Sequence, residues 1–431
     1  MIDIKLIREE PEQVKQRIKI RGLDCSDEID KILLLDKQRR LLISERESAQ
    51  AEQNKLSKEF PQIKKSGGDV SELTNRLASI KDKIKSFDAE LRTAQDELDS
   101  LMLRLPNLPD SDLAPGGKEK NESLRFHGSP LKFDFEPKNH VELCSNLGLI
   151  DYSRAAKLSG AGFWIYRNMG ARLEWALLNY FIDTHIADGY ELILVPHMLV
   201  YECGLTAGQF PKFEDEVFKI SNPVDERMRY MLPTAEAALV SLHRDEILTE
   251  ADLPKKYISY TPCYRREAGT YGSDERGMVR GHQFNKVEMV QFTTPENSDA
   301  AFDELVAKAE NLLAGLGFHF RTVKLAAGDC SASMARTYDI EILLPSMEGY
   351  KEVSSVSNAR DYQARRGAMR FKRGGKTEFM HTLNGSGLAT SRILPALVEQ
   401  NQQKDGSVVI PEILRKYLGG VELLSTTGGK V

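Results

Sequence analysis

The chain has 431 residues, and its composition, 41% hydrophobic and 29% charged, is that of a globular protein with sizeable cores rather than a disordered one. It carries 59 basic and 64 acidic residues, a net charge of −5, which excludes a general polyanion binder and confines any nucleic-acid contact to a local patch. No apolar run reaches the ~18–20 residues that cross a bilayer, so no membrane partner is expected. The five cysteines are scattered and form no CxxC pair, which favours reduced thiols and a cytoplasmic protein.

The N-terminal third contains a heptad pattern. Apolar residues recur at alternating steps of three and four over 70–101 and at seven-residue steps over 35–56, and the segment 61–69, with Pro61 and two glycines, interrupts both patterns. This predicts an antiparallel coiled coil over about 28–103, with ~32 residues per helix and a length of roughly 48 Å. The predicted apolar stripe of the second helix, which would face the first helix, consists of Val70, Leu73, Leu77, Ile80, Ile84, Phe87, Leu91, Ala94, Leu98 and Leu101.

The turn of this hairpin is rich in lysine, whereas the two helices carry nearly equal numbers of basic and acidic residues. Ammonium groups suit contacts with phosphates, and each neutralised phosphate contributes salt-dependent affinity. A solubilising turn would have the same composition, so charge alone leaves both interpretations open. The candidate phosphate-contacting residues are Lys55, Lys58, Lys64 and Lys65.

Composition divides the rest of the chain. Residues 105–124 are rich in Pro, Gly, Asp and Ser, as in a linker, and from about residue 130 the sequence is typical of a mixed α+β domain. We therefore predict an N-terminal domain over 1–110, a linker over 111–130 and a second domain over 131–431. Within the second domain, 172–187 has helical periodicity, and a strand that ends at Pro196 follows it.

Two stretches rich in aromatic and β-branched residues, 256–268 and 282–292, predict an antiparallel hairpin with a long glycine-containing connection. Because residues two apart on a strand share a face, Phe284, Lys286 and Glu288 point the same way. If Arg265 and Glu267 share that face, it presents a ring, two cations and two carboxylates. Burying so many charged groups against an apolar surface would cost a large desolvation free energy, so the face is expected to contact a ligand.

Such a face suits a ligand with a flat base, phosphates and an amine. The ring of Phe284 suits stacking under adenine, Arg265 suits a bidentate clamp on an α-phosphate, and Glu267 suits an adenine amino group. No GxxxxGKS/T motif is present, and Ser159–Phe163 lacks the third glycine of GxGxxG and is typical of a turn. Nucleotide binding would therefore use neither a P-loop nor a dinucleotide-binding fold.

The segment His381–Arg392, HTLNGSGLATSR, combines glycines with a following apolar helical run, which predicts a strand, a turn and a helix. Arg392 would lie in the first turns of that helix. A helix N-terminus and an arginine together suit an anion such as a γ-phosphate. An ordinary surface arginine fits the same pattern.

These motifs resemble those of the bacterial-type seryl-tRNA synthetases, a family of class II aminoacyl-tRNA synthetases. TPCYRREAG and RGMVRGHQFNKVEM resemble motif 2, LNGSGLATSRILPALVEQ resembles motif 3, the helix and strand ending at Pro196 resemble motif 1, and LPTAE at Leu232–Glu236 resembles the serine-site TAE segment. The resemblance covers essentially the whole chain. It implies an α+β class II catalytic domain, an antiparallel β-sheet flanked by helices, preceded by an N-terminal all-α antiparallel coiled-coil arm.

The resemblance also implies a role for each matching residue. Those for L-serine are Thr234, Ala235, Glu236, Glu288, Asn384 and Ser386. Those for ATP are Arg265, Arg266, Glu267, Arg280, Phe284, Glu352, Val353, Ser354, Ser355 and Arg392, with Arg265, Arg280 and Arg392 catalytic. Glu352 and Ser355 would hold Mg²⁺, which requires a bulge or a strand end because residues three apart point to opposite faces of a regular strand.

The implied reaction is the activation of serine by ATP to seryl-adenylate and pyrophosphate, followed by transfer of serine to the 3′ end of tRNA(Ser), and also of tRNA(Sec), by a homodimer. The tip lysines would contact the tRNA. Two other hypotheses stay open: a related protein that activates serine for a non-tRNA acceptor, and a coiled-coil adaptor, which would explain 30–100 but nothing after 130. The chain departs from the common family pattern at Arg266, at Gly281 and within 328–336 and 354–358.

Overall fold

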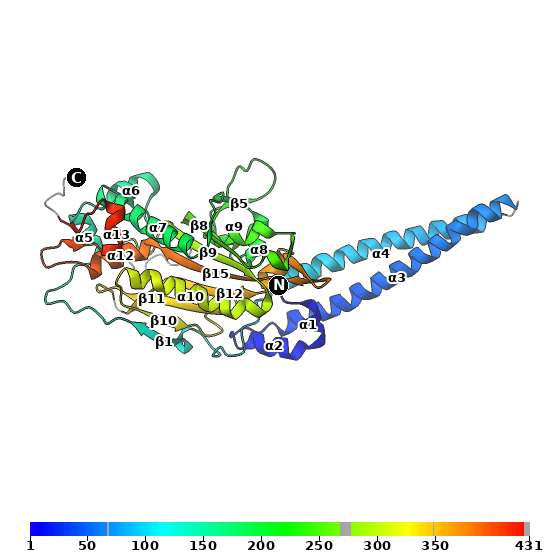
Figure 1. Cartoon of the computed structure of the whole chain (residues 1–431). Helices are drawn as coiled ribbons and strands as arrows, with labels where there is room; N and C mark the ends of the chain where they lie inside the picture. Colours follow the sequence, from blue (N-terminus) through cyan, green and yellow to red (C-terminus); the bar gives the residue numbers. More distant parts are fainter. Residues whose placement is uncertain (67–68, 268–276, 348, 426–431) are drawn as a thin grey trace. The chain divides into compact units, whose positions relative to one another are not determined.

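The structure is a computed structural model that describes residues 1–66, 69–267, 277–347 and 349–425. The chain forms two compact units, which we call the arm unit and the sheet unit (Figure 1). The arm unit comprises Ile2–Lys19 and Leu23–Pro106, and the sheet unit comprises Met1, Ile20–Gly22 and Asn107–Val431. Within the described ranges, no helix combines the length and the apolar composition needed to cross a membrane.

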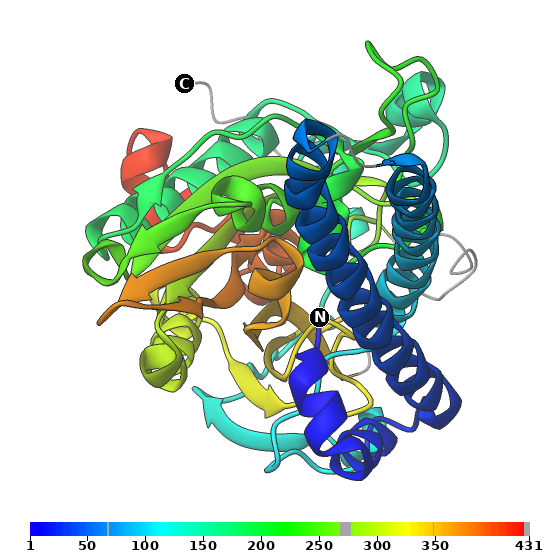
Figure 2. The same cartoon turned by 90° about the vertical axis from the view of Figure 1, so that its right-hand side faces the viewer.

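The arm unit is all-helical, and two of its helices are long and lie side by side (Figures 1 and 2). The apolar stripe predicted from the heptads is confirmed, since its positions from Leu73 to Leu101 are buried or half-buried while most positions between them are exposed. The arm unit is therefore an antiparallel coiled coil on a short helical base. Its helices are α1 (Ile4–Glu9), α2 (Pro11–Lys19), α3 (Ser26–Lys65) and α4 (Ser71–Arg104).

The two helices are separated near the predicted segment 61–69, but the first helix ends four residues after Pro61. Helix α3 continues through Pro61 to Lys65 and closes with a hydrogen bond from the Ser66 N–H to the Gln62 carbonyl at 3.1 Å. A proline removes one backbone donor, but in the last turn few intrahelical bonds remain to be lost. At 1.5 Å per residue the 40-residue helix is ~60 Å long, longer than the roughly 48 Å that the periodicity predicts.

The sheet unit is organised around a sheet of eight strands among the described residues, in the order β1-β10-β11-β12-β15-β9-β8-β4. Every neighbouring pair is antiparallel except β4 and β8, as expected for an α+β fold. The predicted hairpin of 256–268 and 282–292 is confirmed as β8 and β9. The strands are β1 (Glu122–His127), β4 (Glu191–Leu192), β8 (Lys255–Tyr264), β9 (Gln283–Thr293), β10 (Phe320–Lys324), β11 (Arg336–Leu343), β12 (Tyr350–Arg360) and β15 (His381–Ala389).

The two faces of this sheet bury separate apolar cores, because consecutive residues of a strand point to opposite faces. Ile258 and Met289 belong to the core shared with helices α7 (Met169–Ala187), α10 (Ser298–Gly315) and α12 (Thr390–Gln400). Their neighbours Tyr257 and Val290 belong to the second core, with α8 (Tyr201–Ala207) and α9 (Glu236–Val240). Phe284, Lys286 and Glu288 share the face of Val290, so they point away from α7, α10 and α12.

Shorter elements surround these layers. The remaining helices are α5 (His140–Asn146), α6 (Tyr152–Ser159), α11 (Tyr362–Arg366) and α13 (Glu412–Arg415). The small sheets pair β13 (Arg370–Arg373) with both β14 (Lys376–Phe379) and β7 (Ile247–Thr249), β16 (Val408–Val409) with β17 (Leu423–Leu424), β2 (Ile150–Asp151) with β3 (Ile165–Tyr166), and β5 (Met198–Val200) with β6 (Arg229–Met231).

Three local predictions differ from the structure. Within the predicted linker, Glu122–His127 forms the edge strand β1, so that part of the segment belongs to the sheet. The strand predicted to end at Pro196 is only Glu191–Leu192. The predicted turn before Arg392 is wrong, since β15 continues through its glycines to Ala389. A Cβ at Gly387 would collide with the His185 ring of α7. That glycine permits close packing rather than a turn.

Candidate active site

Two adjoining cavities open on the face of the sheet that carries Phe284, Lys286 and Glu288. The larger has a volume of about 460 Å³ and the smaller about 80 Å³. Both are lined by the same five polar residues, which we call the seam: Arg265, Glu267, Lys286, Glu352 and Ser386. Two ligands held in the two cavities would therefore meet at a charged boundary.

The structure brings most of the sequence-predicted site residues to these cavities. Thr234, Glu236, Glu288, Ser355 and Asn384 line the larger one in addition to the seam. Arg280, Phe284, Val353 and Arg392 line the smaller one. Three predicted residues line neither cavity: Ala235, Arg266 and Ser354. Part of the connection between β8 and β9, residues 268–276, lies outside the described residues.

Arg265 follows the last residue of β8 and reaches the boundary between the cavities. Its guanidinium carbon lies 5.1 Å from the centre of the Phe284 ring, and its Nε donates to the Pro233 carbonyl at 3.3 Å. The cross-strand pairing of Cys263 with Phe284 brings these two residues together. The separation of 5.1 Å is within the range of a cation–π contact, which holds the guanidinium group over the ring at the boundary between the cavities.

The smaller cavity is bounded by further cations. Arg280 donates to the Glu267 carboxylate at 2.7 Å. Arg392 is the third residue of α12, and its Nη1 lies 3.6 Å from the Glu352 carboxylate and donates to the Glu352 carbonyl. Three guanidinium groups with a helix N-terminus make this cavity suitable for a polyphosphate.

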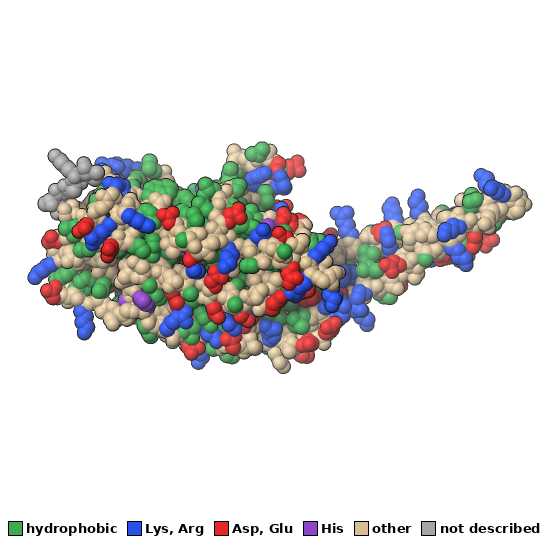
Figure 3. Space-filling view, viewed as in Figure 1, with side chains coloured by type: hydrophobic (Ala, Val, Ile, Leu, Met, Phe, Trp, Pro, Cys, Tyr) green, Lys and Arg blue, Asp and Glu red, His purple; other side chains and the backbone are tan. Residues whose placement is uncertain are grey.

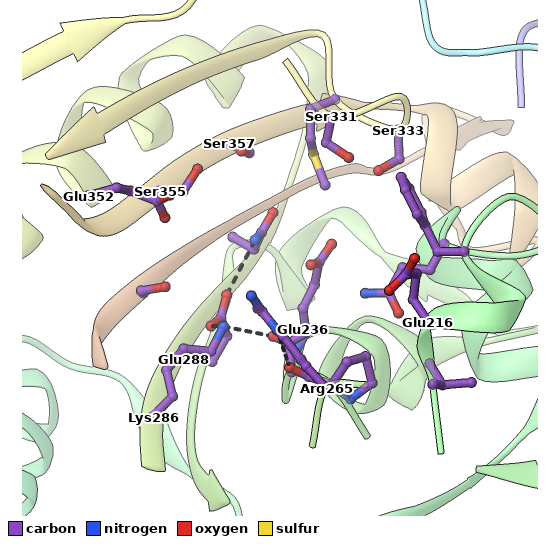
Figure 4. A pocket seen from close by; sticks show the side chains of 18 of the residues that line it. Glu216, Glu236, Arg265, Lys286, Glu288, Ser331, Ser333, Glu352, Ser355 and Ser357 are labelled. Atoms are coloured by element: carbon purple, nitrogen blue, oxygen red, sulfur yellow. Dashed lines mark hydrogen bonds and ion pairs between the residues drawn. The ribbon is translucent and has the colours of Figure 1, made fainter. Parts of the chain in front are cut away.

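The larger cavity contains a buried cluster of charged side chains (Figure 4). Lys286 forms an ion pair with Glu288 and donates to the Thr234 hydroxyl at 2.8 Å, and both members of the pair are less than a tenth exposed. Asn384 donates to Glu288 at 3.3 Å. Burial first, and then the nearby Glu288 carboxylate, raise the pKa of Glu236 to about 7. A ligand ammonium group would offset that penalty and favour the ionised carboxylate.

Gln363 holds Glu236 in place, although sequence analysis did not single it out. Its side-chain amide donates to Glu236 at 2.8 Å, and its oxygen accepts from the Thr382 hydroxyl at 2.6 Å. Because Gln363 lies on α11 and Thr382 on β15, no local pattern could reveal this chain of bonds. Lys286 was also given no role, even though its spacing from Phe284 and Glu288 signalled a shared face.

The bulge that the predicted ion site requires is present in β12. Ile340 pairs with Ser354 and Glu341 with Glu352, so Val353 has no partner on β11. The extra residue lets both Glu352 and Ser355 line the larger cavity. Their carboxylate and hydroxyl oxygens fit a hard cation such as Mg²⁺. No three Asp, Glu, His or Cys side chains among the described residues are grouped to hold a metal by themselves, so phosphate or water oxygens would complete the shell.

The wall of the larger cavity formed by Ser331, Ser333 and Met334 is supported from behind by Arg21. This arginine is 6% exposed and donates to the backbone carbonyls of Asn107 at 2.9 Å, Ala327 at 3.0 Å, Cys330 at 3.2 Å, Ser331 at 3.4 Å and Met334. The Asn107 side chain donates to the Ser333 carbonyl at 3.0 Å. Both supports are more than 200 residues distant in sequence, so sequence analysis did not find them.

Glu174 of α7 braces the sheet on the face opposite the cavities. It accepts from Asn285 of β9 at 2.7 Å and from the Thr390 hydroxyl of α12 at 2.6 Å. Burial raises its pKa to about 7, although these hydrogen bonds oppose the shift. One carboxyl group thus joins the long helix, the strand that bears Lys286 and the helix that bears Arg392.

The four predicted phosphate-contacting lysines belong to the arm unit. Lys55, Lys58, Lys64 and Lys65 are all exposed near the end of α3. Elsewhere along α3 and α4, basic and acidic side chains are interspersed, with ion pairs such as Arg46–Asp88 at 3.1 Å (Figure 3). The excess of cations is therefore local to the tip.

Comparisons with known proteins agree with this architecture. A family model for the tRNA synthetase class II core domain (G, H, P, S and T) matches residues 218–401, and one for the seryl-tRNA synthetase N-terminal domain matches residues 1–109. The chain is 58% identical over 425 residues to serine–tRNA ligase 2 of Clostridium acetobutylicum, with 97% of this chain and 99% of the relative covered. It is 45% identical over 427 residues to the serine–tRNA ligase of Thermodesulfovibrio yellowstonii, at 97% and 99% coverage.

A solved structure has the same fold over nearly the whole chain. It is the crystal structure of seryl-tRNA synthetase from Pyrococcus horikoshii complexed with ATP, with a TM-score of 0.92, 34% identity, and coverage of 98% of this chain and 99% of that one. The antiparallel sheet with its arginine-lined cavities thus defines a class II aminoacyl-tRNA synthetase. Within that class, the chain belongs to the seryl-tRNA synthetase family.

Proposed function

We propose that the protein joins L-serine to tRNA(Ser) in two steps, with serine in the larger cavity and ATP spanning the seam, its adenine at Phe284 in the smaller cavity. The observation that carries this proposal is the charged seam common to both cavities. Serine carboxylate and ATP are both anions, and their reaction requires positive charge where they meet. Arg265 and Lys286 supply that charge at the seam.

In the first step a carboxylate oxygen of serine attacks the α-phosphorus of ATP. The new oxygen–phosphorus bond forms as the bond to the β-phosphate bridge breaks, and pyrophosphate leaves with the electron pair. Arg265 is proposed to hold the α-phosphate, Phe284 the adenine ring, and Arg280 and Arg392 the outer phosphates. The protein supplies positioning and electrostatic stabilisation, and no protein nucleophile is needed.

Serine recognition is proposed to rest on the buried cluster. Glu236 and Glu288 would accept hydrogen bonds from the ammonium group, and Thr234, Asn384 and Ser386 offer polar groups to the hydroxyl. Alanine would leave such a partner unpaired, and sites of this kind reject an analogue that lacks the hydroxyl by about 10⁴-fold. The main-chain amide of Ala235 is not needed in this assignment, because Ala235 lines neither cavity.

Mg²⁺ is proposed to bind to Glu352 and Ser355. When bound, it would neutralise phosphate charge. The chain's own contribution is the bulge at Val353, which turns both side chains into the cavity, and the contact of Arg392 with Glu352, which keeps that carboxylate at the seam. Ser354 donates instead to the Ser386 carbonyl at 2.7 Å, so it supports the strand pairing.

In the second step a hydroxyl of the terminal ribose of the tRNA attacks the carboxyl carbon of seryl-adenylate. The ester bond forms, AMP leaves with the electron pair of the broken bond, and the hydroxyl proton is released. The arm unit with its lysine tip supports a tRNA with an extended shape as the acceptor, recognised through its backbone more than its bases. We further propose tRNA(Sec) as a second acceptor. For the domain division we propose 1–110, 111–130 and 131–431, in which the connecting segment 111–130 contributes strand β1 to the sheet of the second domain.

Two assays test the proposal. Exchange of pyrophosphate into ATP, measured with each of the twenty amino acids, should depend on serine, and charging of purified tRNA(Ser) should follow. Exchange without charging would favour the alternative, a protein that activates serine for a non-tRNA acceptor. The comparisons do not favour that alternative, since full-length relatives with both units are serine–tRNA ligases.

We also propose that the protein works as a homodimer in the cytoplasm. Trp175 and Ile186 of α7 and Leu194 beyond β4 are about half-exposed or more, and a cavity of about 250 Å³ lined mainly by apolar residues adjoins α7. An apolar surface of this kind suits a second copy of the chain. Light scattering should give twice the mass of one chain, and a monomer at micromolar concentration would contradict the dimer.

The cytoplasmic location is proposed from the cysteines. The five described cysteines are all free thiols, as suits a reducing compartment.

A further inference from the structure

A second group of buried polar side chains lies outside both cavities. It consists of Glu399 in the last turn of α12, His140 at the start of α5 and Ser346 after β11, and we call it the anchor cluster. Glu399 is 0% exposed and His140 is 2% exposed. Oε1 of Glu399 accepts from the His140 backbone N–H at 2.9 Å, from the His140 ring Nδ1 at 2.7 Å and from the Ser346 hydroxyl at 2.7 Å. Its Oε2 accepts from the Ser346 N–H at 3.0 Å. The cluster lines neither cavity, and the proposed reaction does not use it.

The carboxyl group of Glu399 is ionised in this cluster. Burial opposes ionisation, but the hydrogen bonds from His140 and Ser346 outweigh it and hold the pKa of Glu399 below its usual value. An ionised carboxylate only accepts hydrogen bonds, so the Nδ1 atom of His140 carries a hydrogen and donates it. A buried carboxylate that loses a donor is left uncompensated. The four bonds therefore hold α12, α5 and the turn after β11 in fixed relative positions.

Glu399 connects the anchor cluster to Arg392, because both residues lie on α12, which packs against α5 (Figure 1). Arg392 is the third residue of this 11-residue helix and Glu399 is the tenth. At 1.5 Å per residue, the two positions are ~10 Å apart along the helix axis. A helix is a rigid element, so a shift at one end moves the other. Holding Glu399 thus also sets the position of Arg392 at the smaller cavity.

The ring of His140 lies against the segment that leads to Arg280. A Cβ atom on Gly277 would lie 2.5 Å from the ring Nε2, so the backbone of this glycine passes close to the ring. The next two residues, Met278 and Val279, are buried in the core to which α5 also contributes. Arg280 follows them and lines the smaller cavity. The ring of His140 therefore supports the segment that places this second arginine.

We propose that His140 and Glu399 are positioning residues for the outer phosphates of ATP. Glu399 sets the place of Arg392 through α12, and His140 sets the place of Arg280 through its contact with Gly277. The inference rests on the proposed function, in which these two arginines hold the outer phosphates. Because neither positioning residue lines a cavity, each acts only through an arginine.

The serine side of the seam has separate support. Gln363 of α11 donates to Glu236, and Lys286 pairs with Glu288 on β9. Neither contact involves the anchor cluster. Disturbing the cluster should therefore weaken the binding of ATP and leave the binding of serine unchanged, whereas a general loss of structure would weaken both.

Two substitutions break the anchor cluster on different sides. His140→Asn keeps an amide nitrogen near the position of Nδ1, and so a donor to Glu399, but its side chain is too short to reach Gly277. Glu399→Gln leaves one acceptor oxygen for four donors. In steady-state pyrophosphate exchange, each variant should raise the KM for ATP about tenfold or more and leave the KM for serine within about twofold, because small displacements of positioned groups are costly.

His319→Asn is the matched control. His319 is 5% exposed, and its ring bonds to the His127 carbonyl at 2.8 Å and to the Tyr350 hydroxyl at 2.7 Å, so the substitution likewise shortens a buried, hydrogen-bonded histidine. Since it lines neither cavity, both KM values should stay within about twofold of wild type. A rise in the KM for ATP in this control equal to that in His140→Asn would overturn the proposal.

A double substitution tests whether Glu399 acts through Arg392. In the Arg392→Ala background, Glu399→Gln should raise the KM for ATP by clearly less than it does in the wild type, because the side chain that it positions is absent. Fully multiplicative effects of the two substitutions would contradict that route.

A measurement on the unaltered protein covers variants that do not fold. Because coupling between two sites is reciprocal, saturating ATP with Mg²⁺ should slow hydrogen exchange at the backbone amides of His140 and Ser346, which both donate to Glu399, and serine alone should not. Unchanged exchange at both amides with ATP bound would overturn the proposal, as would an equal rise in both KM values in the two variants. If the proposed function itself is wrong, the wild-type protein will show no serine-dependent pyrophosphate exchange, which separates the two failures.

Discussion

Apart from Asp36, which is buried and paired with three arginines, the coiled coil of the arm unit and the cavities of the sheet unit hold their charges in opposite ways. In the arm, ion pairs such as Arg46–Asp88 and Lys31–Glu97 are about half-exposed. Around the cavities, the Lys286–Glu288 pair is 7% and 1% exposed. Exposed pairs contribute ~0–1 kcal/mol each, whereas removing one partner of a buried pair costs ~3–5 kcal/mol. Function in the arm should therefore be spread over many replaceable contacts, while function at the cavities should depend on a few residues.

The largest expected effect tests the cavity side of this comparison. Arg265→Ala should lower the rate of serine-dependent pyrophosphate exchange by about 10²–10³-fold, because it removes a charge aimed at the reacting phosphate. The protein should stay folded, as measured by circular dichroism and thermal unfolding. The neighbouring Arg266→Ala is the matched control and should lower exchange by less than about tenfold, since Arg266 lines neither cavity. Equal losses in the two variants would contradict the role given to Arg265.

Removing the arm should separate the two units by function. Deletion of residues 35–98, with a short flexible connection in their place, should leave exchange within about threefold of wild type. Charging of tRNA(Ser) should fall by about 100-fold or more in kcat/KM, because the phosphate contacts of the coiled coil are lost. Steady-state assays of both reactions on the same preparation check this. Full charging activity in the deleted protein would mean that the arm does not bind the tRNA.

A smaller effect concerns the ionisation of Glu236. Because its pKa is raised to about 7, its ionised fraction grows as the pH rises through that value, and ammonium binding should improve with it. The wild-type KM for serine should fall between about pH 6 and pH 8. In Glu236→Gln the KM should be about 10–100-fold higher, for the loss of a charged hydrogen bond, and should not vary over this range. A pH-dependent KM in the variant would assign the titration to another group.

The raised pKa of Glu236 also predicts how the stability of the ligand-free protein depends on pH. Its folded-state pKa is raised above the ordinary value, so its stabilising contribution is fully present below that ordinary value and is lost as the pH rises through about 7. Urea unfolding without serine should show the free energy of unfolding of the wild type falling relative to Glu236→Gln over this interval. Saturating serine should reduce that difference.

The smallest effect tests the arm side of the comparison. The double substitution Lys64→Ala with Lys65→Ala should weaken tRNA binding about 2–10-fold, and the slope of log Kd against log salt should fall by about 1–2 for the lost phosphate contacts. Lys81→Ala with Lys83→Ala is the matched control, because these lysines are equally exposed but lie along α4, away from the tip. Filter binding at several salt concentrations measures both. An identical loss in the control would mean that charge anywhere on the arm suffices.

The sequence predicts the repetitive elements well. The apolar stripe of the coiled coil, the β8–β9 hairpin and helix α7 are confirmed, because heptad and two-residue periodicities indicate which side of an element is buried. Its predictions are less accurate where the role of a single residue depends on its packing against the rest of the fold. The interruption predicted over 61–69 starts after Lys65 rather than at Pro61, and the glycines before Arg392 were expected in a turn, whereas Gly387 makes room for His185.

The site residues also fall into those that contiguous motifs predict and those that only long-range contacts reveal. Residues on the matching motifs reach the cavities, with Ala235, Arg266 and Ser354 as the exceptions. Gln363, which holds Glu236, and Arg21, which supports the Ser331–Met334 wall, were missed. Each acts on atoms more than 100 residues away, so no spacing in the sequence could show the contact.

What the sequence by itself determined is the order of the elements and the faces that they bury, since these follow from the period of apolar residues within one segment. It also determined the family, through motifs of contiguous residues. Only the tertiary structure decided that the bulge at Val353 brings Glu352 and Ser355 into one cavity, and that five polar residues form a seam between two cavities. Those features depend on the register between strands distant in the chain, which is set by the packing of the whole sheet.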